Sequence, residues 1–331
     1  MNEYLMTLKN KFDYSDELIN FLGQLIPTLI KYYGEEHREI ILSTLSNCEI
    51  HFQRKDEDPK TFLNSYFNVN KEWKIPFLAG AFYHNEIIVK DNQVFAKPII
   101  YLKQKLLRKY TPFDFNDDNQ LNTLIHEICH SIKGYGNVKV QNGKIIDSSG
   151  LSKDTYSYSQ ENGVVEEKND MVGIEEALNT AETTQILEMM TGRKQKIIGY
   201  RAAGYFATQL LQHSDITKVI RASQFSGDDS WIQYIGEEQS KLLIENFDIL
   251  VNSLYVSHKD INTPEKRQAL FDKMGLAQDV ICEFIDNYCS KEDVDAFTQS
   301  LEIADKKTVE MAQQIVTIKP NTAEVSSPIK K

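Results

Sequence analysis

At residues 121–132 the chain reads Leu-Asn-Thr-Leu-Ile-His-Glu-Ile-Cys-His-Ser-Ile. Five apolar residues of this stretch recur at helical spacing and define one face: Leu121, Leu124, Ile125, Ile128 and Ile132. Good capping residues precede it at Asn116-Asp117-Asp118, and Gly134 follows it. The pattern therefore predicts an amphipathic helix from about residue 120 to residue 133.

The polar residues of the same stretch form the pattern His-Glu-x-x-His. His126 and His130 are one helical turn apart, so both imidazoles can reach one metal ion. Glu127 lies about 100° around the helix from His126, which suits a general base acting on water beside the metal. The chain has seven His, and a chance match has a probability of roughly 1%. We interpret the pattern as a zinc site rather than as two surface histidines beside a solvated Glu127.

Catalytic zinc usually has three protein ligands, so a third is expected elsewhere in the chain. Downstream, the segment 172–182 reads as the start of a helix and contains the acidic residues Glu175, Glu176 and Glu182. A plain structural alternative is an acidic helix N-terminus, which the helix macrodipole favours.

Together the two segments resemble the gluzincin metallopeptidases, the thermolysin-like clan, whose second zinc helix carries an Asn-Glu-Ala-x-Ser-Asp-type run. In this resemblance Glu176 takes the place of the ligand, with Glu175 and Glu182 as alternatives. The resemblance covers about residues 121–190. It implies a zincin-like fold, one zinc ion per chain and hydrolysis of peptide bonds.

The chain departs from the family pattern in two places. His130 and Glu176 are farther apart than in thermolysin, so residues 135–172 are expected to form an inserted polar hairpin or long loop. Thr180 stands where the family has an aspartate that steadies the first histidine. We therefore expect Asn179, Thr180 or a backbone carbonyl to hold His126.

Two further elements would complete a peptidase site. Strands are predicted at 80–90, with a hairpin at His84-Asn85, and at 97–103; one of them would be the edge strand that binds an extended substrate. After the third-ligand helix come three candidate donors to the oxyanion, of which we favour Tyr200 over Arg201 and Tyr205.

The pattern along the chain predicts an α+β fold that is mostly helical. Residues 1–115 are expected to form N-terminal helices and a small mixed sheet that includes the substrate edge strand. Residues 116–214 would hold the zinc-binding helices, residues 215–318 a helical C-terminal lobe, and residues 319–331 a flexible tail.

Composition excludes several classes of protein. The net charge of −11 argues against nucleic acid as the main partner, since duplex binding depends on Lys and Arg. No apolar run approaches the ~20 residues of a membrane span. The first residues do not form a secretory signal peptide, so we expect a protein that is cytoplasmic or exported without a recognisable signal peptide. The four cysteines show no paired spacing and are expected to be reduced.

The leading hypothesis is a zinc-dependent metallopeptidase that acts on a peptide or protein substrate. His126, His130 and Glu176 would hold zinc and Glu127 would be the general base. One alternative is a non-enzymatic binding or regulatory protein on a zincin scaffold. A third hypothesis keeps the metal-assisted hydrolysis but directs it at a non-peptide amide.

Overall fold

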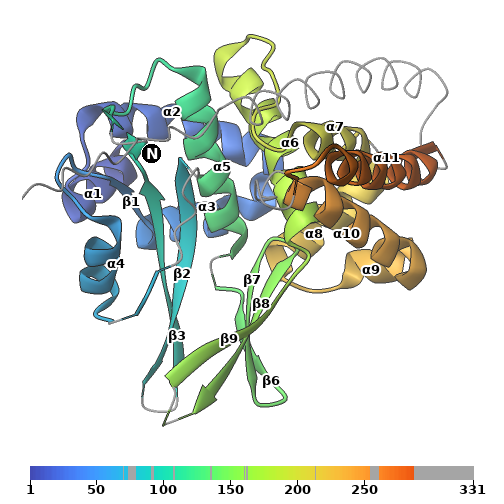
Figure 1. Ribbon diagram of the computed structural model, residues 1–331. Coiled ribbons are helices and arrows are strands. Elements are labelled where there is room, and N and C mark those ends of the chain that lie inside the picture. The colour runs from blue at the N-terminus through green and yellow to red at the C-terminus, as the bar shows by residue number, and fades with distance from the viewer. Residues whose placement is uncertain are drawn as a thin grey trace, which may run out of the picture.

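The computed structural model describes residues 1–69, 71–73, 80–90, 93–106, 109–134, 136–159, 161, 163–212, 214–253 and 261–286. Its fold is α+β and mostly helical, with two small sheets and a helical C-terminal region, which confirms the predicted fold class. Figure 1 shows the N-terminal helices on one side, the later helices on the other, and the two sheets extending below them. The predicted tail, and residues 287–318 of the predicted C-terminal lobe, lie outside the described residues.

The N-terminal region is a helical layer, as its apolar spacing predicts. It consists of α1 (Asn2–Phe12), α2 (Asp16–Tyr33), the 3-10 turn η1 (Glu35–His37) and α3 (Arg38–Asn47). Ser15 caps α2 by accepting a hydrogen bond from the backbone N–H of Leu18. Most apolar side chains of α2 are buried in a first core that also takes in the apolar face of the helix at Asp118–Gly134.

The first sheet contains three strands in the order β1-β3-β2. β1 (Glu49–Phe52) runs parallel to β3 (Gln93–Leu102), and β2 (Ala81–Lys90) pairs antiparallel with β3 and forms the edge. The expected hairpin at His84-Asn85 is wrong: both residues lie inside β2, opposite Ile99 and Pro98. His84 and Asn85 continue the strand because both pair with β3. The side-chain Nδ2 of Asn85 donates hydrogen bonds to both carboxylate oxygens of Asp147.

Short elements complete this half of the molecule. α4 (Pro59–Phe67) follows β1, and its buried residues Leu63 and Phe67 form a small aromatic core with residues of β3. β4 (Lys105–Leu106) and β5 (Lys109–Tyr110) form a separate two-stranded ribbon.

Residues 138–170 form a second sheet, where the sequence predicted a hairpin or long loop. It is an antiparallel meander of β6 (Val138–Gln141), β7 (Lys144–Ser149), β8 (Ser152–Ser159) and β9 (Gly163–Asp170). Asn142 and Gly143 join the first two strands with φ angles of 51° and 73°, the conformation of a tight hairpin turn. This Asn-Gly pair is the sequence signal that could have predicted the hairpin.

The remaining helices contribute to both cores. They are α5 (Asp118–Gly134), α6 (Val172–Thr191), α7 (Arg201–Leu210), α8 (Ser214–Ser226), α9 (Ser230–Ile235), α10 (Glu237–Asn252) and α11 (Pro264–Asp286). α5 packs its apolar face in the first core, and the helices after it build the second core. α6 joins the two cores, because Ile186 and Leu187 pack in the first core while Ile174 and Leu178 pack in the second. None of the described helices combines the length and the apolar composition needed to cross a membrane.

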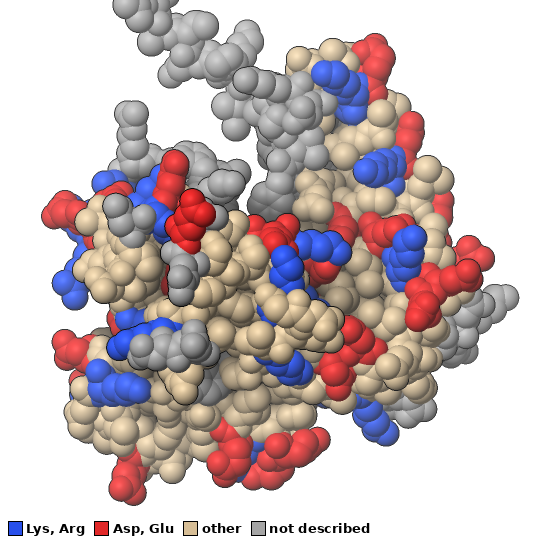
Figure 2. Space-filling view, turned by 90° about the horizontal axis from the view of Figure 1, so that it is seen from below, with Lys and Arg blue, Asp and Glu red and all other residues tan. Residues whose placement is uncertain are grey.

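The charged side chains are mixed on the face of the molecule below the sheets. Figure 2 shows Lys and Arg interspersed with Asp and Glu on this face, with no continuous basic area among its described residues.

Candidate metal centre

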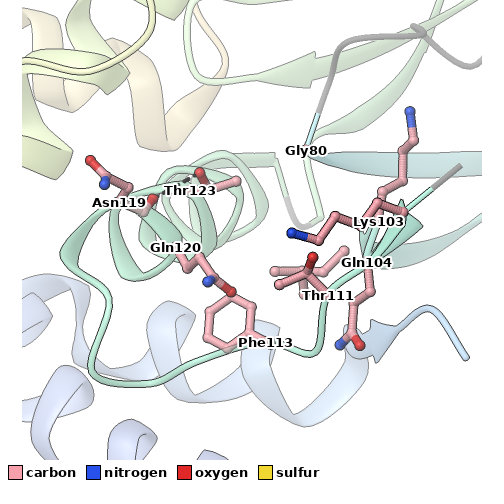
Figure 3. Close-up of a pocket in the computed structure, with 10 residues that line it drawn as sticks. Gly80, Lys103, Gln104, Thr111, Phe113, Asn119, Gln120 and Thr123 are labelled. Atoms are coloured by element: carbon pink, nitrogen blue, oxygen red, sulfur yellow. Dashed lines mark hydrogen bonds between the residues drawn. The ribbon is translucent and has the colours of Figure 1, made fainter. Parts of the chain in front are cut away.

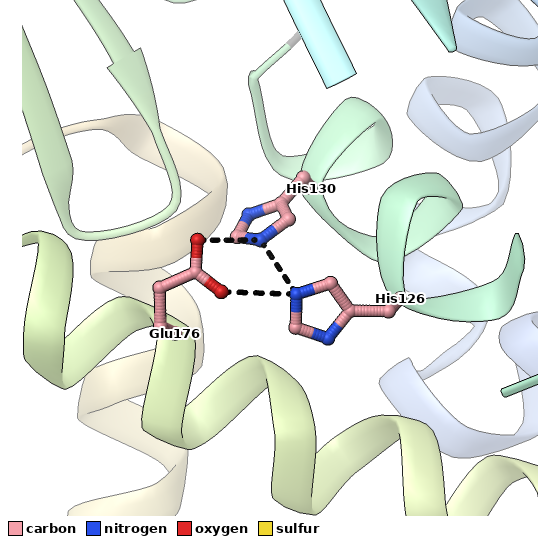
Figure 4. Close-up of side chains that lie close together, drawn as sticks. All are labelled: His126, His130 and Glu176. Atoms are coloured by element: carbon pink, nitrogen blue, oxygen red, sulfur yellow. Dashed lines mark hydrogen bonds and ion pairs between the residues drawn. The ribbon is translucent and has the colours of Figure 1, made fainter. Parts of the chain in front are cut away.

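The side chains of His126, His130 and Glu176 converge between α5 and α6 (Figure 4). The Nε2 atoms of the two histidines are 3.1 Å apart. Glu176 Oε2 lies 3.0 Å from Nε2 of His126, and its Oε1 lies 3.5 Å from Nε2 of His130. All the candidate ligand atoms lie within 4.8 Å of one another, so this group could hold one metal ion.

The distances between these side chains also suit the ligands of one metal ion. Tetrahedral ligands about 2.0–2.1 Å from zinc lie about 3.4 Å apart, close to the observed spacings of 3.0–3.5 Å. Two neutral imidazoles whose Nε2 lone pairs face one another and a carboxylate lack protons to share, and a cation between them removes the repulsion. The three residues therefore have the chemistry to hold one metal ion.

A buried lysine holds the two metal-binding helices together. Lys133 of α5 is 0% exposed, and its Nζ lies 2.5 Å from Glu175 and 3.0 Å from both Glu182 and Asn179 of α6. Burial lowers the pKa of Lys133, but the two carboxylates outweigh it and hold that pKa above its ordinary value. Glu175 and Glu182, the alternative ligands, are thus engaged by Lys133, and Glu176 is the acid that joins the histidines.

The expected support for His126 differs from what the structure has. Asn179 Nδ2 donates to the backbone carbonyl oxygen of His126 at 2.8 Å, so it holds the helical turn and not the ring. Thr180 is 2% exposed, and its Oγ1 has no hydrogen-bond partner among the described residues.

Glu127 lies beside this cluster and contacts the edge strand. It is 8% exposed, and its Oε2 accepts a 2.7 Å hydrogen bond from the backbone N–H of Tyr83 in β2. Burial raises the pKa of Glu127 above its ordinary value, and the rings of His126 and His130 act in the opposite direction. A carboxyl whose pKa is raised toward neutrality is suited to taking up and releasing a proton.

Electrostatic coupling within the cluster is strong. Burial disfavours the charged form of His130, but the Glu176 carboxylate outweighs it and raises the pKa of His130 above its ordinary value. Burial also disfavours ionised Glu176, yet the two histidines hold its pKa well below its usual range. The carboxylate is therefore ionised at neutral pH, as a metal ligand must be.

The cluster opens into a cleft of about 280 Å³. One wall is β2 and the opposite wall is formed by β7, β8 and the end of β9, with α5 and α6 at the base. Tyr200, at the start of α7, also lines the cleft, and its ring centroid lies 6.5 Å from that of His126. Arg201 is exposed and Tyr205 packs against the second core, and neither lines the cleft.

A second cavity of about 380 Å³ adjoins the first turns of α5 (Figure 3). It is lined by Gly80 just before β2, by Lys103 and Phe113, and by Asn119 and Thr123 of α5. Thr123 lies one helical turn before His126 and Glu127, so this cavity lies along the same side of α5 as those two residues.

Three residues of the cleft were not predicted from the sequence. Asp147 of β7, Asp154 of β8 and Asn85 of β2 all line it. Burial and the neighbouring carboxylate of Asp154 raise the pKa of Asp147 to about 7. Burial and the charge of Glu166 raise the pKa of Asp154 to about 6. The sequence pattern at 135–172 predicted a hairpin or loop without strand register, so it did not predict that Asp147 and Asp154 lie opposite each other.

The described cysteines, Cys48, Cys129 and Cys282, form no disulfide, as the spacing predicted. The fourth, Cys289, lies outside the described residues. Burial raises the pKa of Cys129, the one nearest the metal cluster, to about 12, so its thiol stays protonated at neutral pH.

Comparison with known proteins adds no family to this description. No protein-family model, no curated protein and no solved structure matches the chain. What is established about the site is a His-His-Glu group that could hold one metal ion, in a cleft that also contains Glu127.

Proposed function

We propose that this protein is a zinc-dependent metallopeptidase of the gluzincin type, acting on peptide or protein substrates. One observation carries the proposal: His126, His130 and Glu176 converge in a cleft that also holds Glu127 and a free strand edge. A purely structural metal site needs neither a neighbouring base nor an open cleft. The sequence resemblance to gluzincins supports the same function.

His126, His130 and Glu176 would hold the zinc. Zinc bound by two histidines and a carboxylate supplies Lewis acidity toward a carbonyl oxygen and makes nearby water more acidic. Glu127 takes the proton from the attacking water and passes it to the leaving amine. The hydrogen bond from the Tyr83 N–H orients the Glu127 carboxylate for both transfers.

The substrate would bind along β2. Among the described strands, β3 alone pairs with β2, and the other edge of β2 faces the cleft, where an extended peptide can add main-chain hydrogen bonds. Tyr200, the residue just before α7, lines the cleft with its ring centroid 6.5 Å from that of His126. We assign it the role of hydrogen-bond donor to the oxygen of the carbonyl under attack.

The test is cleavage of a quenched fluorescent peptide library by the zinc-loaded protein, with and without a chelator. Glu127→Gln should keep about one zinc per chain and lose at least ~100-fold in cleavage rate. His126→Ala should lose the zinc. As a matched control, the same exchange at the exposed Glu245 of α10 should leave both zinc content and cleavage unchanged. Full activity of the Glu127→Gln protein would refute the mechanism.

The same assay separates the other two hypotheses. A non-enzymatic binding protein would take up zinc but leave every peptide intact. A hydrolase for non-peptide amides would also spare the library, yet would hydrolyse small acylated amines in a manner that depends on zinc and Glu127.

A further inference from the structure

The cleft contains a second group of polar side chains, opposite the metal cluster. Asp147 and Asp154 are directly opposed in the antiparallel pairing of β7 with β8, so their side chains share one face of that sheet. Asp147 is 7% exposed, and both residues line the cleft. Two ionised carboxylates at such positions repel each other, and either a bound proton or a cation between them relieves the repulsion.

Hydrogen-bond acceptors in this group lack donors. Asn85 is 7% exposed, and its Nδ2 donates hydrogen bonds to both carboxylate oxygens of Asp147, at 3.1 Å each. Its Oδ1, and Oδ1 of Asp154, have no hydrogen-bond partner among the described residues. The described residues also place no Lys or Arg close enough to lower the pKa of either aspartate. A cation that carries several N–H donors would supply both acceptors with donors and would compensate both carboxylates.

The position of the group relates it to the proposed reaction centre. Tyr83 of β2 donates its N–H to Glu127, and Asn85 lies two residues farther along the same strand, on the same face. Two residues of a strand span about 6.7 Å. A peptide lying along β2 with a carbonyl group at Glu127 would thus bring the side chain of a neighbouring residue to Asn85.

Cavities on both sides indicate that the cation belongs to a side chain and not to a chain end. One cavity reaches Gly80, before the contact with Glu127, and another is lined by residues of β2 as far as Ile87. A peptide along β2 can therefore continue in both directions past the metal cluster.

We propose that Asn85, Asp147 and Asp154 form a specificity subsite that binds the ammonium or guanidinium group of a Lys or Arg side chain next to the scissile bond. This inference rests on the proposed function. The raised pKa values of the two aspartates agree with this subsite. A bound cation would lower both pKa values and would offset the repulsion between the two carboxylates.

Binding, measured apart from catalysis, tests the subsite. The protein is the zinc-loaded Glu127→Gln variant, and the probes are fluorescent peptides blocked at both ends that differ only in one central residue: Lys, Arg, norleucine or Glu. We expect Lys and Arg peptides to bind about 10- to 100-fold more tightly than the norleucine peptide. Equal affinities, or a preference that appears only with a free amino terminus, would overturn the proposal.

Variants locate the preference. Asp154→Asn, combined with Glu127→Gln, should reduce the Lys-to-norleucine ratio at least ~10-fold. Glu167→Gln on β9 removes the same charge from the same sheet outside the cleft and should keep the ratio. Asp154→Asn should also raise the melting temperature, because it removes a buried repulsion; a merely structural aspartate would lower it. If that variant does not fold, Asp147→Asn provides the same comparison.

The outcomes separate the subsite from the peptidase proposal. Wild-type protein that cleaves peptides without favouring Lys or Arg would refute the subsite and leave the peptidase intact. A strong preference in binding, together with no cleavage by the wild-type protein, would refute the peptidase and leave the subsite. Calcium binding that Asp154→Asn abolishes, without any effect on peptide preference, would assign the aspartates to a metal ion and overturn the subsite.

Discussion

Two pairs of acidic residues lie near the His126–His130–Glu176 cluster, and they differ in whether a positively charged side chain lies between them. Glu175 and Glu182 share Lys133, which lies between them with 0% exposure. Asp147 and Asp154 face each other across two strands, where Asn85 donates to Asp147 and the Tyr156 hydroxyl donates to Asp154. The first pair has its counter-ion inside the fold, whereas no described Lys or Arg serves the second. Compensated charge of this kind holds helices together, and uncompensated charge at a cleft indicates a ligand.

The largest expected effect comes from removing the internal counter-ion. Lys133→Met leaves Glu175 and Glu182 buried without a cation, and we expect it to lower the free energy of unfolding by about 3–5 kcal/mol. Because Lys133 joins α5 to α6, zinc affinity should fall with it. Urea denaturation and zinc titration measure the two effects.

An exposed lysine is the control for this variant. Lys144→Met breaks the pair with Glu167, in which both side chains are more than a third exposed, and should leave the free energy of unfolding nearly unchanged because solvent screens the pair. If Lys133→Met were equally mild, the two acidic pairs would not differ in the way that the structure indicates.

Next in size is the pH dependence of peptide preference. The pKa values of Asp147 and Asp154 are about 7 and about 6, so both are largely neutral at pH 5 and ionised at pH 8. The other titratable groups facing them are Glu166, Tyr83 and Tyr156, and the two tyrosines stay protonated over this range. The Lys-to-norleucine ratio of binding constants should therefore rise about 10-fold from pH 5 to pH 8.

Using a ratio of two peptides at each pH cancels the titration of the metal ligands, which affects both peptides alike. A ratio that stays flat from pH 5 to pH 8 would show that the aspartates do not contact the cation.

The smallest effect concerns stability without any ligand. Each aspartate has a folded-state pKa above its unfolded value of 3.8, so its protonated form stabilises the fold below that value. This contribution is lost as the pH rises through about 6 to 7. Asp154→Asn should remove much of this loss and raise the free energy of unfolding at pH 8 by about 1 kcal/mol. Chemical denaturation at pH 5 and pH 8 measures it, and a variant less stable than wild type at pH 8 would contradict the uncompensated pair.

The metal-binding helix was predictable because its information is local. The apolar spacing, the cap and the His-Glu-x-x-His pattern lie within one stretch, and the structure forms α5 at 118–134 with its apolar face in the first core. Choosing Glu176 over its acidic neighbours needed the family resemblance, because helical spacing alone does not distinguish three acids of one helix. In the structure Glu176 lies beside the histidines and the other two acids lie beside Lys133.

The fold class, the helix that carries His126 and His130, and the strands before it follow from local sequence patterns, since propensity, capping and periodicity act between residues close in the chain. Long-range packing was needed to show that the strands at 138–170 form a sheet and that Asp154 lies opposite Asp147. It also decided that Lys133 is buried between two glutamates of α6. Strand register and the burial of a charge depend on partners distant in the chain, and local sequence patterns do not specify them.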